Sequence, residues 1–141
     1  MADPRADVNF NEIGAEFVTF KIDASTITYS ATSANGSAQV GLAVAFSAAE
    51  TVELAGDGEE IVGKLISVEP DGYCTVQVAG FMTLPGGTSA LLTPGKKIVG
   101  DLLVSAEGYI REVATGTAAE LGVARGMIID AGVTTAVVVR L

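Results

Sequence analysis

Short runs in which apolar and polar residues alternate follow one another along most of this chain, with turn residues between them. Residues 16–22 are the first clear run, with Val18, Phe20 and Ile22 at every second position. This period of two is typical of strands that are buried on one face. We expect further strands at residues 26–29, 39–46, 51–54, 61–69, 73–78, 81–84, 98–105, 109–113, 127–130 and 134–141. For residues 39–46, a helix is the alternative.

The clearest hairpin pairs residues 61–69 with residues 73–78. In the second run, Cys74 shares one face with the alternating valines. The connection is Glu69-Pro70-Asp71-Gly72. Pro70 suits the first central position of a turn, and Gly72 suits a left-handed residue that closes it.

Many short strands with turn signals every ~8–12 residues indicate a barrel or a sandwich. We therefore predict a mainly β fold: a small β-barrel or β-sandwich with an extended N-terminal arm and at most one short helix. The helix is expected at residues 118–123, at the capping box Thr117-Ala118-Ala119-Glu120. We divide the chain of 141 residues into an arm at residues 1–15 and a single β-rich domain at residues 16–141.

The composition favours strands and turns over long helices. Hydrophobic residues make up 49% of the chain but aromatic residues only 6%, so the core must consist mostly of Val, Ile, Leu and Ala. β-branched side chains fit strands well. Seventeen glycines are many for this length and fit a chain with many bends.

The charge balance argues against two classes of partner. The formal net charge is −9, from eight basic and seventeen acidic residues, and the only adjacent basic pair is Lys96-Lys97. Nucleic acid and anionic membranes attract clustered Lys and Arg, so we expect no direct nucleic-acid partner and no membrane partner. The polar N-terminus does not resemble a secretory signal, and we expect the protein to be made in the cytoplasm.

The chain offers few groups for catalysis. It has no histidine and a single cysteine, Cys74. The lack of histidine excludes serine triads and most zinc sites. We interpret Cys74 as a buried core thiol because it shares a strand face with valines. We therefore expect no enzymatic activity and no cofactor.

Two other motifs carry little weight. Gly58-x-x-x-x-Gly63-Lys64 nearly spells a phosphate-binding loop, but Leu65 stands where Ser or Thr is required, and a strand is predicted where the motif needs a helix. The acidic residues Asp57, Glu59 and Glu60 flank a glycine. Calcium needs six or more oxygen ligands, so we interpret this cluster as a solvated turn and expect no metal.

The hairpin and the residues after it carry a family resemblance. The sequence IVGKLISV at residues 61–68, followed by DGYCTVQVAGF at residues 71–81 and Leu84-Pro85, is similar to the decoration, or cement, proteins of tailed bacteriophages. In that family a strand containing V-G precedes a G-x-x-T-V-Q-x-x-G strand. A short strand ending in Leu-Pro follows, and then a strand opened by glycine, matched here by residues 95–99. The resemblance covers roughly residues 56–101, under half of the chain.

The resemblance implies a non-enzymatic virion protein that binds the outer surface of a phage capsid and stabilises it. It implies the major capsid protein as partner and self-association, often as a homotrimer. We expect an arm such as residues 1–15 to become ordered against the capsid or a neighbouring copy, since a strand can add to the edge of a partner's sheet. The candidate residues for capsid or inter-subunit contact are Asn9, Phe10, Ile13 and Phe17.

Two alternatives remain open from the sequence. The first is another virion structural subunit, of the tail tube or of head completion, since such rings are also built from β modules. The second is a small β-barrel carrier or enzyme that uses acidic groups such as Asp57 or Glu59. A lipoyl-type carrier would display a modified lysine, but Gly95-Lys96-Lys97 lacks the acidic residue expected before that lysine.

Overall fold

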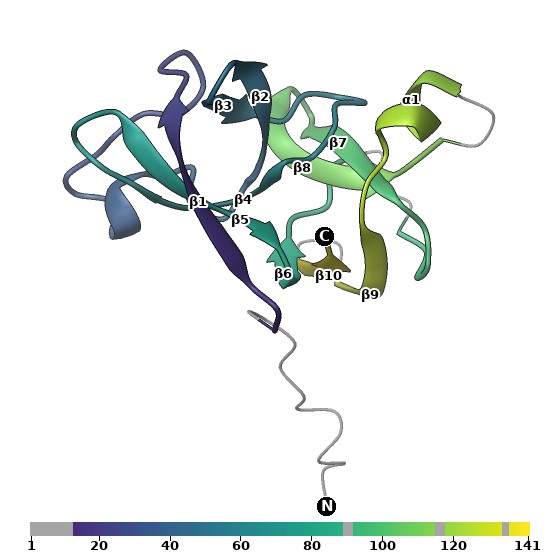
Figure 1. The fold of residues 1–141 in the computed structure, drawn as a ribbon. Helices are drawn as coiled ribbons and strands as arrows, with labels where there is room; N and C mark the ends of the chain where they lie inside the picture. Colours follow the sequence, from purple (N-terminus) through teal and green to yellow (C-terminus); the bar gives the residue numbers. More distant parts are fainter. Residues whose placement is uncertain (1–12, 89–91, 115–117, 134–135) are drawn as a thin grey trace, which may run out of the picture.

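The predicted mainly β class is confirmed, and the barrel form of it is the one adopted (Figure 1). The computed structural model describes residues 13–88, 92–114, 118–133 and 136–141. Its helical segments are a short 3-10 turn, η2 (Ala34–Gly36), and the helix α1 (Ala118–Val123). The strands are β1 (Glu16–Ile22), β2 (Ala43–Ala48), β3 (Thr51–Leu54), β4 (Gly63–Val68), β5 (Tyr73–Ala79), β6 (Phe81–Leu84), β7 (Ile98–Leu103), β8 (Ala106–Glu112), β9 (Met127–Val133) and β10 (Ala136–Arg140).

The predicted strand at residues 26–29 is wrong. The chain turns here because Asp23 organises it locally: its Oδ1 accepts hydrogen bonds from the Ser25 amide at 3.0 Å and the Ser25 hydroxyl at 2.7 Å. The Thr26 amide donates to the Asp23 carbonyl at 3.2 Å, which closes the turn. Ile27 is fully buried nevertheless. The apolar residue at this position therefore indicated a buried side chain and not a paired strand.

The prediction for residues 39–46 is right only in its second half. β2 begins at Ala43, and before it the Leu42 amide donates to the Gln39 carbonyl at 3.2 Å in a turn. The strand interpretation, and not the helix, describes the residues that follow. The short helix at residues 118–123 is confirmed.

The first five strands form a closed barrel in the order β1-β3-β2-β4-β5. β1 is antiparallel to β5 over most of its length, and β4 and β5 form the predicted hairpin. The contact between β1 and β3 is parallel and short, with Lys21 opposite Thr51 and Ile22 opposite Val52. Closure of the barrel at this seam therefore depends on the C-terminal end of β1.

The remaining strands form a second lobe beside the barrel (Figure 1). β6, β10 and β9 make a three-stranded sheet, and β7 pairs with β8. β2 belongs to both cores: Val44 packs inside the barrel, whereas Ala43 and Ala45 face the core of the second lobe. Two hydrophobic cores therefore share one strand between them.

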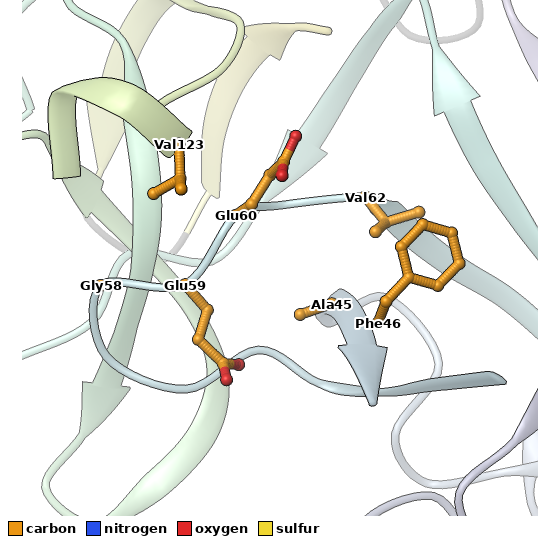
Figure 2. A pocket seen from close by; sticks show the side chains of 7 residues that line it. All are labelled: Ala45, Phe46, Gly58, Glu59, Glu60, Val62 and Val123. Carbon is orange, nitrogen blue, oxygen red and sulfur yellow. The ribbon is translucent and has the colours of Figure 1, made fainter. Parts of the chain in front are cut away.

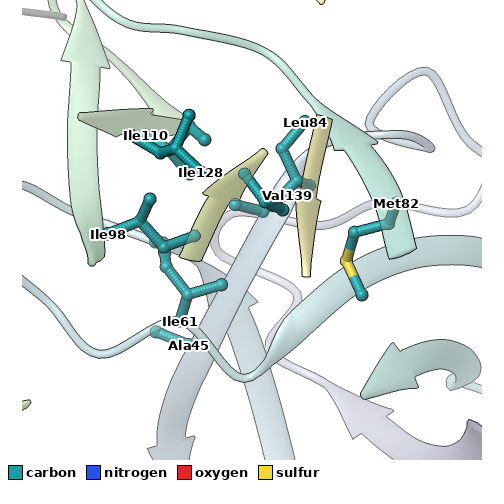
Figure 3. Close-up of a cluster of buried hydrophobic side chains, with 10 residues drawn as sticks. Ala45, Ile61, Met82, Leu84, Ile98, Ile110, Ile128 and Val139 are labelled. Atoms are coloured by element: carbon teal, nitrogen blue, oxygen red, sulfur yellow. The ribbon is translucent and has the colours of Figure 1, made fainter. Parts of the chain in front are cut away.

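The core of the second lobe is built from branched aliphatic side chains of several strands (Figure 3). Burial of such side chains contributes about 1.5–3 kcal/mol each, so this cluster stabilises the joint between the lobes. Its fully buried branched side chains are Ile61, Leu84, Ile98, Ile110 and Val139, and Met82 and Ile128 are almost fully buried.

Candidate functional site

β1 and the residues before it carry two of the four candidate contact residues in exposed positions. Ile13 is 51% exposed and Phe17 is 50% exposed. Asn9 and Phe10 lie outside the described residues. Both described candidates are thus available to a partner, and their role as contacts stays a prediction.

The exposure of β1 follows from its pairing. Its N-terminal half is paired with β5 but extends past the start of β3. Val18, on the inward-facing side of the strand, is therefore exposed. Tyr73 on β5 is exposed as well, but it lies opposite Lys21 at the other end of β1. We call Ile13, Phe17 and Val18 the β1 surface. Exposed large apolar side chains that gather in one region mark interaction sites more often than scattered ones do.

An aromatic pair lies next to the β1 surface. The rings of Phe20 and Phe46 meet edge to face, with centroids 5.3 Å apart and an interplanar angle of 85°. Phe20 packs against the barrel core, while Phe46 remains exposed. The exposed ring of Phe46 is therefore held in place by the partly buried ring of Phe20.

The base of the arm is attached to β6. The Phe81 amide donates to the Ile13 carbonyl at 2.9 Å. Gly80, with φ of 93°, lies so close to Gly14 that a Cβ at position 80 would overlap its backbone. A hollow of about 340 Å³ lies at this junction and is lined by Ile13, Gly14, Ala79, Gly80, Phe81 and Leu141. Residues 13–15 thus leave the domain at a defined point on the β5–β6 side of β1.

The hairpin residues that carry the resemblance have structural roles. Gly63, at the start of β4, faces the carbonyl oxygen of Gln77, and a Cβ at this position would overlap it. The Gln77 side chain is buried, and its Nε2 donates to the carbonyls of Ala79 and Phe81, both at 3.2 Å. These two bonds hold the bend at Gly80 that leads from the barrel into the second lobe.

A groove of about 210 Å³ separates the barrel from α1 (Figure 2). Ala45, Phe46, Val62 and Val123 give it apolar walls, and the loop at Gly58 brings Glu59 and Glu60 to its edge. The Glu59 carboxylate accepts a hydrogen bond from the Gly56 amide at 2.7 Å. Burial raises the pKa of the Glu53 carboxyl, and so does the negative charge of Glu59, Asp23 and Glu107. The negative charge of Glu59 at the edge of the groove therefore disfavours a phosphate ligand there.

The acidic cluster of residues 57–60 is tied to its own chain. Asp57 Oδ1 accepts a hydrogen bond from Arg111 Nε at 3.1 Å, and Arg111 Nη1 also donates to Glu120 Oε2 at 3.0 Å. Hydrogen bonding to Arg111 and to the Ala114 amide lowers the pKa of Glu120 to about 2. Within the described parts of the chain, no group of three or more His, Cys, Asp or Glu side chains is placed to hold a metal ion.

The interpretation of Cys74 as a core thiol is confirmed. Its side chain is buried, and burial raises the pKa of the thiol to about 11. A reactive cysteine needs an exposed thiolate with a lowered pKa. The phosphate-loop spelling also fails as predicted, because Gly63 begins a strand and not a helix.

Three contributors to the exposed surface were missed from the sequence: Val18, Phe46 and Tyr73. Val18 and Phe46 lie in strand patterns that are typical of core positions, whereas Tyr73 lies on the face of its strand opposite to Cys74. Their exposure depends on which strand edge is left open, and local alternation carries no signal of that.

Across the stretches that the structure describes, no helix has the length and apolar character needed to span a bilayer. Comparison of the chain with models of known protein families, with curated proteins and with solved structures finds no match in any of the three.

Proposed function

We propose that this protein is a capsid decoration protein of a tailed bacteriophage, which binds the outer surface of the capsid as a homotrimer and stabilises it without catalysis. The observation that carries the proposal is the β1 surface. It places exposed apolar side chains at the base of an N-terminal arm, next to the hairpin that resembles this family. Binding of this surface to the major capsid protein would locate the protein on the virion.

The arrangement of the side chains supports a structural protein more than an enzyme. The carboxylates that an enzyme or carrier could have used, Asp57 and Glu59, are hydrogen-bonded within the chain, and Cys74 is buried. The net charge of −9 disfavours non-specific aggregation of the free protein before assembly. Two cores joined through β2 give the rigidity that a clamp between capsid subunits requires.

The test is direct binding to mature capsids that lack the protein. Purified protein should sediment with these capsids and raise the temperature at which they open. If the protein stays in the supernatant and the capsids open at the same temperature with and without it, the proposal is wrong. Localisation to the tail by electron microscopy would favour the tail-tube alternative instead.

A pair of variants tests the surface itself. Phe17→Ser removes a half-exposed aromatic ring from the β1 surface, and Leu121→Ser removes a side chain of matched exposure, 52%, from α1 in the other lobe. We expect Phe17→Ser to weaken capsid binding about tenfold or more, as loss of an aromatic anchor does. Leu121→Ser should bind as the wild type does. Equal binding by both variants would remove the β1 surface from the proposal.

A further inference from the structure

The N-terminal half of β1 has one open edge. Among the described residues, β3 pairs with β1 only at Lys21 and Ile22, whereas β5 pairs with β1 from Glu16 onward. Figure 1 shows this half of β1 extending away from β2 and β3. The open edge spans residues 16–20. We use the name "β1 edge" for it below.

At two residues of the β1 edge, Phe17 and Thr19, the backbone groups point away from β5 to a side where no strand pairs with them among the described residues. The amides of Lys21 and Asp23 donate toward β3, to the carbonyls of Glu50 and Val52, both at 2.8 Å. The Ile22 amide donates in the opposite direction, to Gly72 at 3.0 Å beside β5. Because strand groups alternate in direction, the amides and carbonyls of Phe17 and Thr19 point to the side of Lys21, where β3 no longer runs.

A hollow lies along this edge. It measures about 410 Å³ and is lined by the four consecutive residues 18–21, together with Glu50 and Tyr73. Consecutive residues of a strand point to opposite faces. A hollow that touches all of them must therefore follow the backbone edge and not one face of the sheet.

The β1 edge is guarded against pairing only at its first residue, Glu16, where a charge coincides with an irregularity in the pairing with β5. Exposed edges in soluble proteins are commonly guarded by charged residues, prolines or bulges. The four residues 17–20 are Phe, Val, Thr and Phe, with no charge and no proline. Phe17 and Val18 are exposed on opposite faces, so an added strand would bury apolar surface on both sides.

The occupant is suggested by the chain before Ile13. The twelve residues before it include Asp7-Val8-Asn9-Phe10-Asn11, in which apolar and polar residues alternate as in a strand. Twelve extended residues reach about 40 Å. A domain of this size has a radius of gyration of about 14 Å, so the arm is long enough to reach a neighbouring copy.

The same copy is a poor host for its own arm. Ile13 is held by the Phe81 amide on the β5–β6 side of β1, opposite to the β1 edge. This hydrogen bond therefore prevents the arm from folding back in a tight hairpin onto the β1 edge of its own copy. We propose that residues 7–11 of one copy add as a strand to the β1 edge of a second copy, and bond there to the backbone of Phe17 and Thr19.

This strand exchange rests on the self-association in the proposed function, but it needs no capsid. Repeated around a ring, one donated arm and one accepted arm per copy close a cyclic oligomer. The experiment is therefore done with the full-length protein alone, by sedimentation velocity over a concentration series.

Thr19→Pro is the acceptor variant. It removes an amide that points to the open edge and leaves the β1–β5 hydrogen bonds in place, since proline is tolerated on edge strands. Thr19→Ala is the matched control, because it keeps the amide. We expect the wild type and Thr19→Ala to associate, and Thr19→Pro to associate at least about tenfold more weakly, as loss of backbone bonds at an edge implies.

The donor variant lacks residues 2–11 and should be monomeric. Mixing it with Thr19→Pro should restore a one-to-one dimer, because one copy still has an open edge and the other still has an arm. Amide exchange reads the edge directly: the Phe17 and Thr19 amides should be protected in the associated wild type and should exchange fast in the donor variant. The Ile22 amide, which donates to the Gly72 carbonyl, should stay protected in both and so reports that the donor variant is folded.

Three outcomes would overturn the exchange. They are a monomeric wild type, equal association of Thr19→Pro and Thr19→Ala, and fast exchange at Phe17 and Thr19 in the associated wild type. A monomeric wild type whose capsid binding is lost in Thr19→Pro would assign the β1 edge to a capsid segment instead. Association through the arm without any capsid binding would leave the exchange standing and would contradict only the proposed function.

Discussion

Arg125 Nη1 donates a hydrogen bond to the carbonyl oxygen of Val62 at 3.0 Å, and so ties the segment before β9 to the segment that leads into β4. The same guanidinium donates to the carbonyls of Ile61 at 3.2 Å and Val78 at 2.9 Å. Arg125 therefore connects the second lobe to the segment that leads into β4 and to β5. A planar fork with several donors suits this arrangement of carbonyls better than an ammonium group does.

Arg125→Met should lower the free energy of unfolding by about 3 kcal/mol, because it leaves three partly buried carbonyls without their charged donor. Urea denaturation measures the loss. Arg125→Lys is the control. It keeps the charge, but its single ammonium group cannot bond to residues 61–62 and to Val78 at once. Its free energy of unfolding should therefore lie between those of the wild type and Arg125→Met. A loss below about 0.5 kcal/mol for Arg125→Met would show that the lobes do not depend on this contact.

The stability that Glu120 contributes should vanish in acid. Its pKa is about 2 in the folded protein, against 4.5 for an ordinary glutamate, because Arg111 and the Ala114 amide stabilise the charged form. A lowered folded pKa contributes stability that is complete above pH 4.5 and is lost as the pH falls toward 2. At pH 7, Glu120→Gln should be less stable than the wild type by about 1 kcal/mol.

Denaturation of Glu120→Gln and the wild type at pH 7, 4 and 2.5 measures this difference. Glu60→Gln, which removes an exposed carboxylate from a nearby loop, reports the effect of net charge alone. The difference for Glu120→Gln should shrink steadily below pH 4.5. A difference that stays constant into acid would contradict the ion pair as its cause.

Gly63→Ala should destabilise the protein by about 3 kcal/mol or more, or prevent folding, because the added methyl group overlaps the Gln77 carbonyl on the neighbouring strand β5. Gly122→Ala is the matched control. A Cβ at position 122 meets no atom within 4 Å, and alanine favours a helix by about 1 kcal/mol over glycine. Thermal unfolding of the two variants should therefore shift in opposite directions.

Cys74 should react with a thiol reagent only when the barrel opens. A pKa of about 11 in place of 9.0 lowers the fraction of thiolate at pH 8 about 100-fold, and burial blocks access as well. Labelling with Ellman's reagent should be at least that much slower in the native protein than in urea. Fast labelling of the folded protein would mean that the face of β5 that carries Cys74 is exposed.

Local alternation predicted most of the strands because each apolar face is buried wherever a strand is half covered. β1, β3 and β6 begin and end where the pattern predicted. Residues 26–29 failed because an aspartate two residues before a serine competes with strand pairing by local hydrogen bonds. The hydrogen bonds of Asp23 favour a turn, and the alternating run of four residues was too short to predict a strand reliably.

The candidate site was only partly accessible from the sequence. Ile13 and Phe17 were singled out as contact candidates, and both are exposed. Val18 was not, because an exposed apolar residue in a strand has the same local pattern as a buried one. Only the partner strand distinguishes them, and the parallel pairing of β1 with β3 joins residues about thirty positions apart.

The sequence by itself determined the mainly β class, the short helix, the core role of Cys74 and the failure of the phosphate-loop spelling, since each of these depends on local periodicity or on residue type. Only the tertiary structure decided that the first five strands close into a barrel, that β2 serves two cores and that β1 leaves an edge open. Strand order is set by contacts between distant segments, whose free energy depends on packing in three dimensions and leaves no local pattern in the chain.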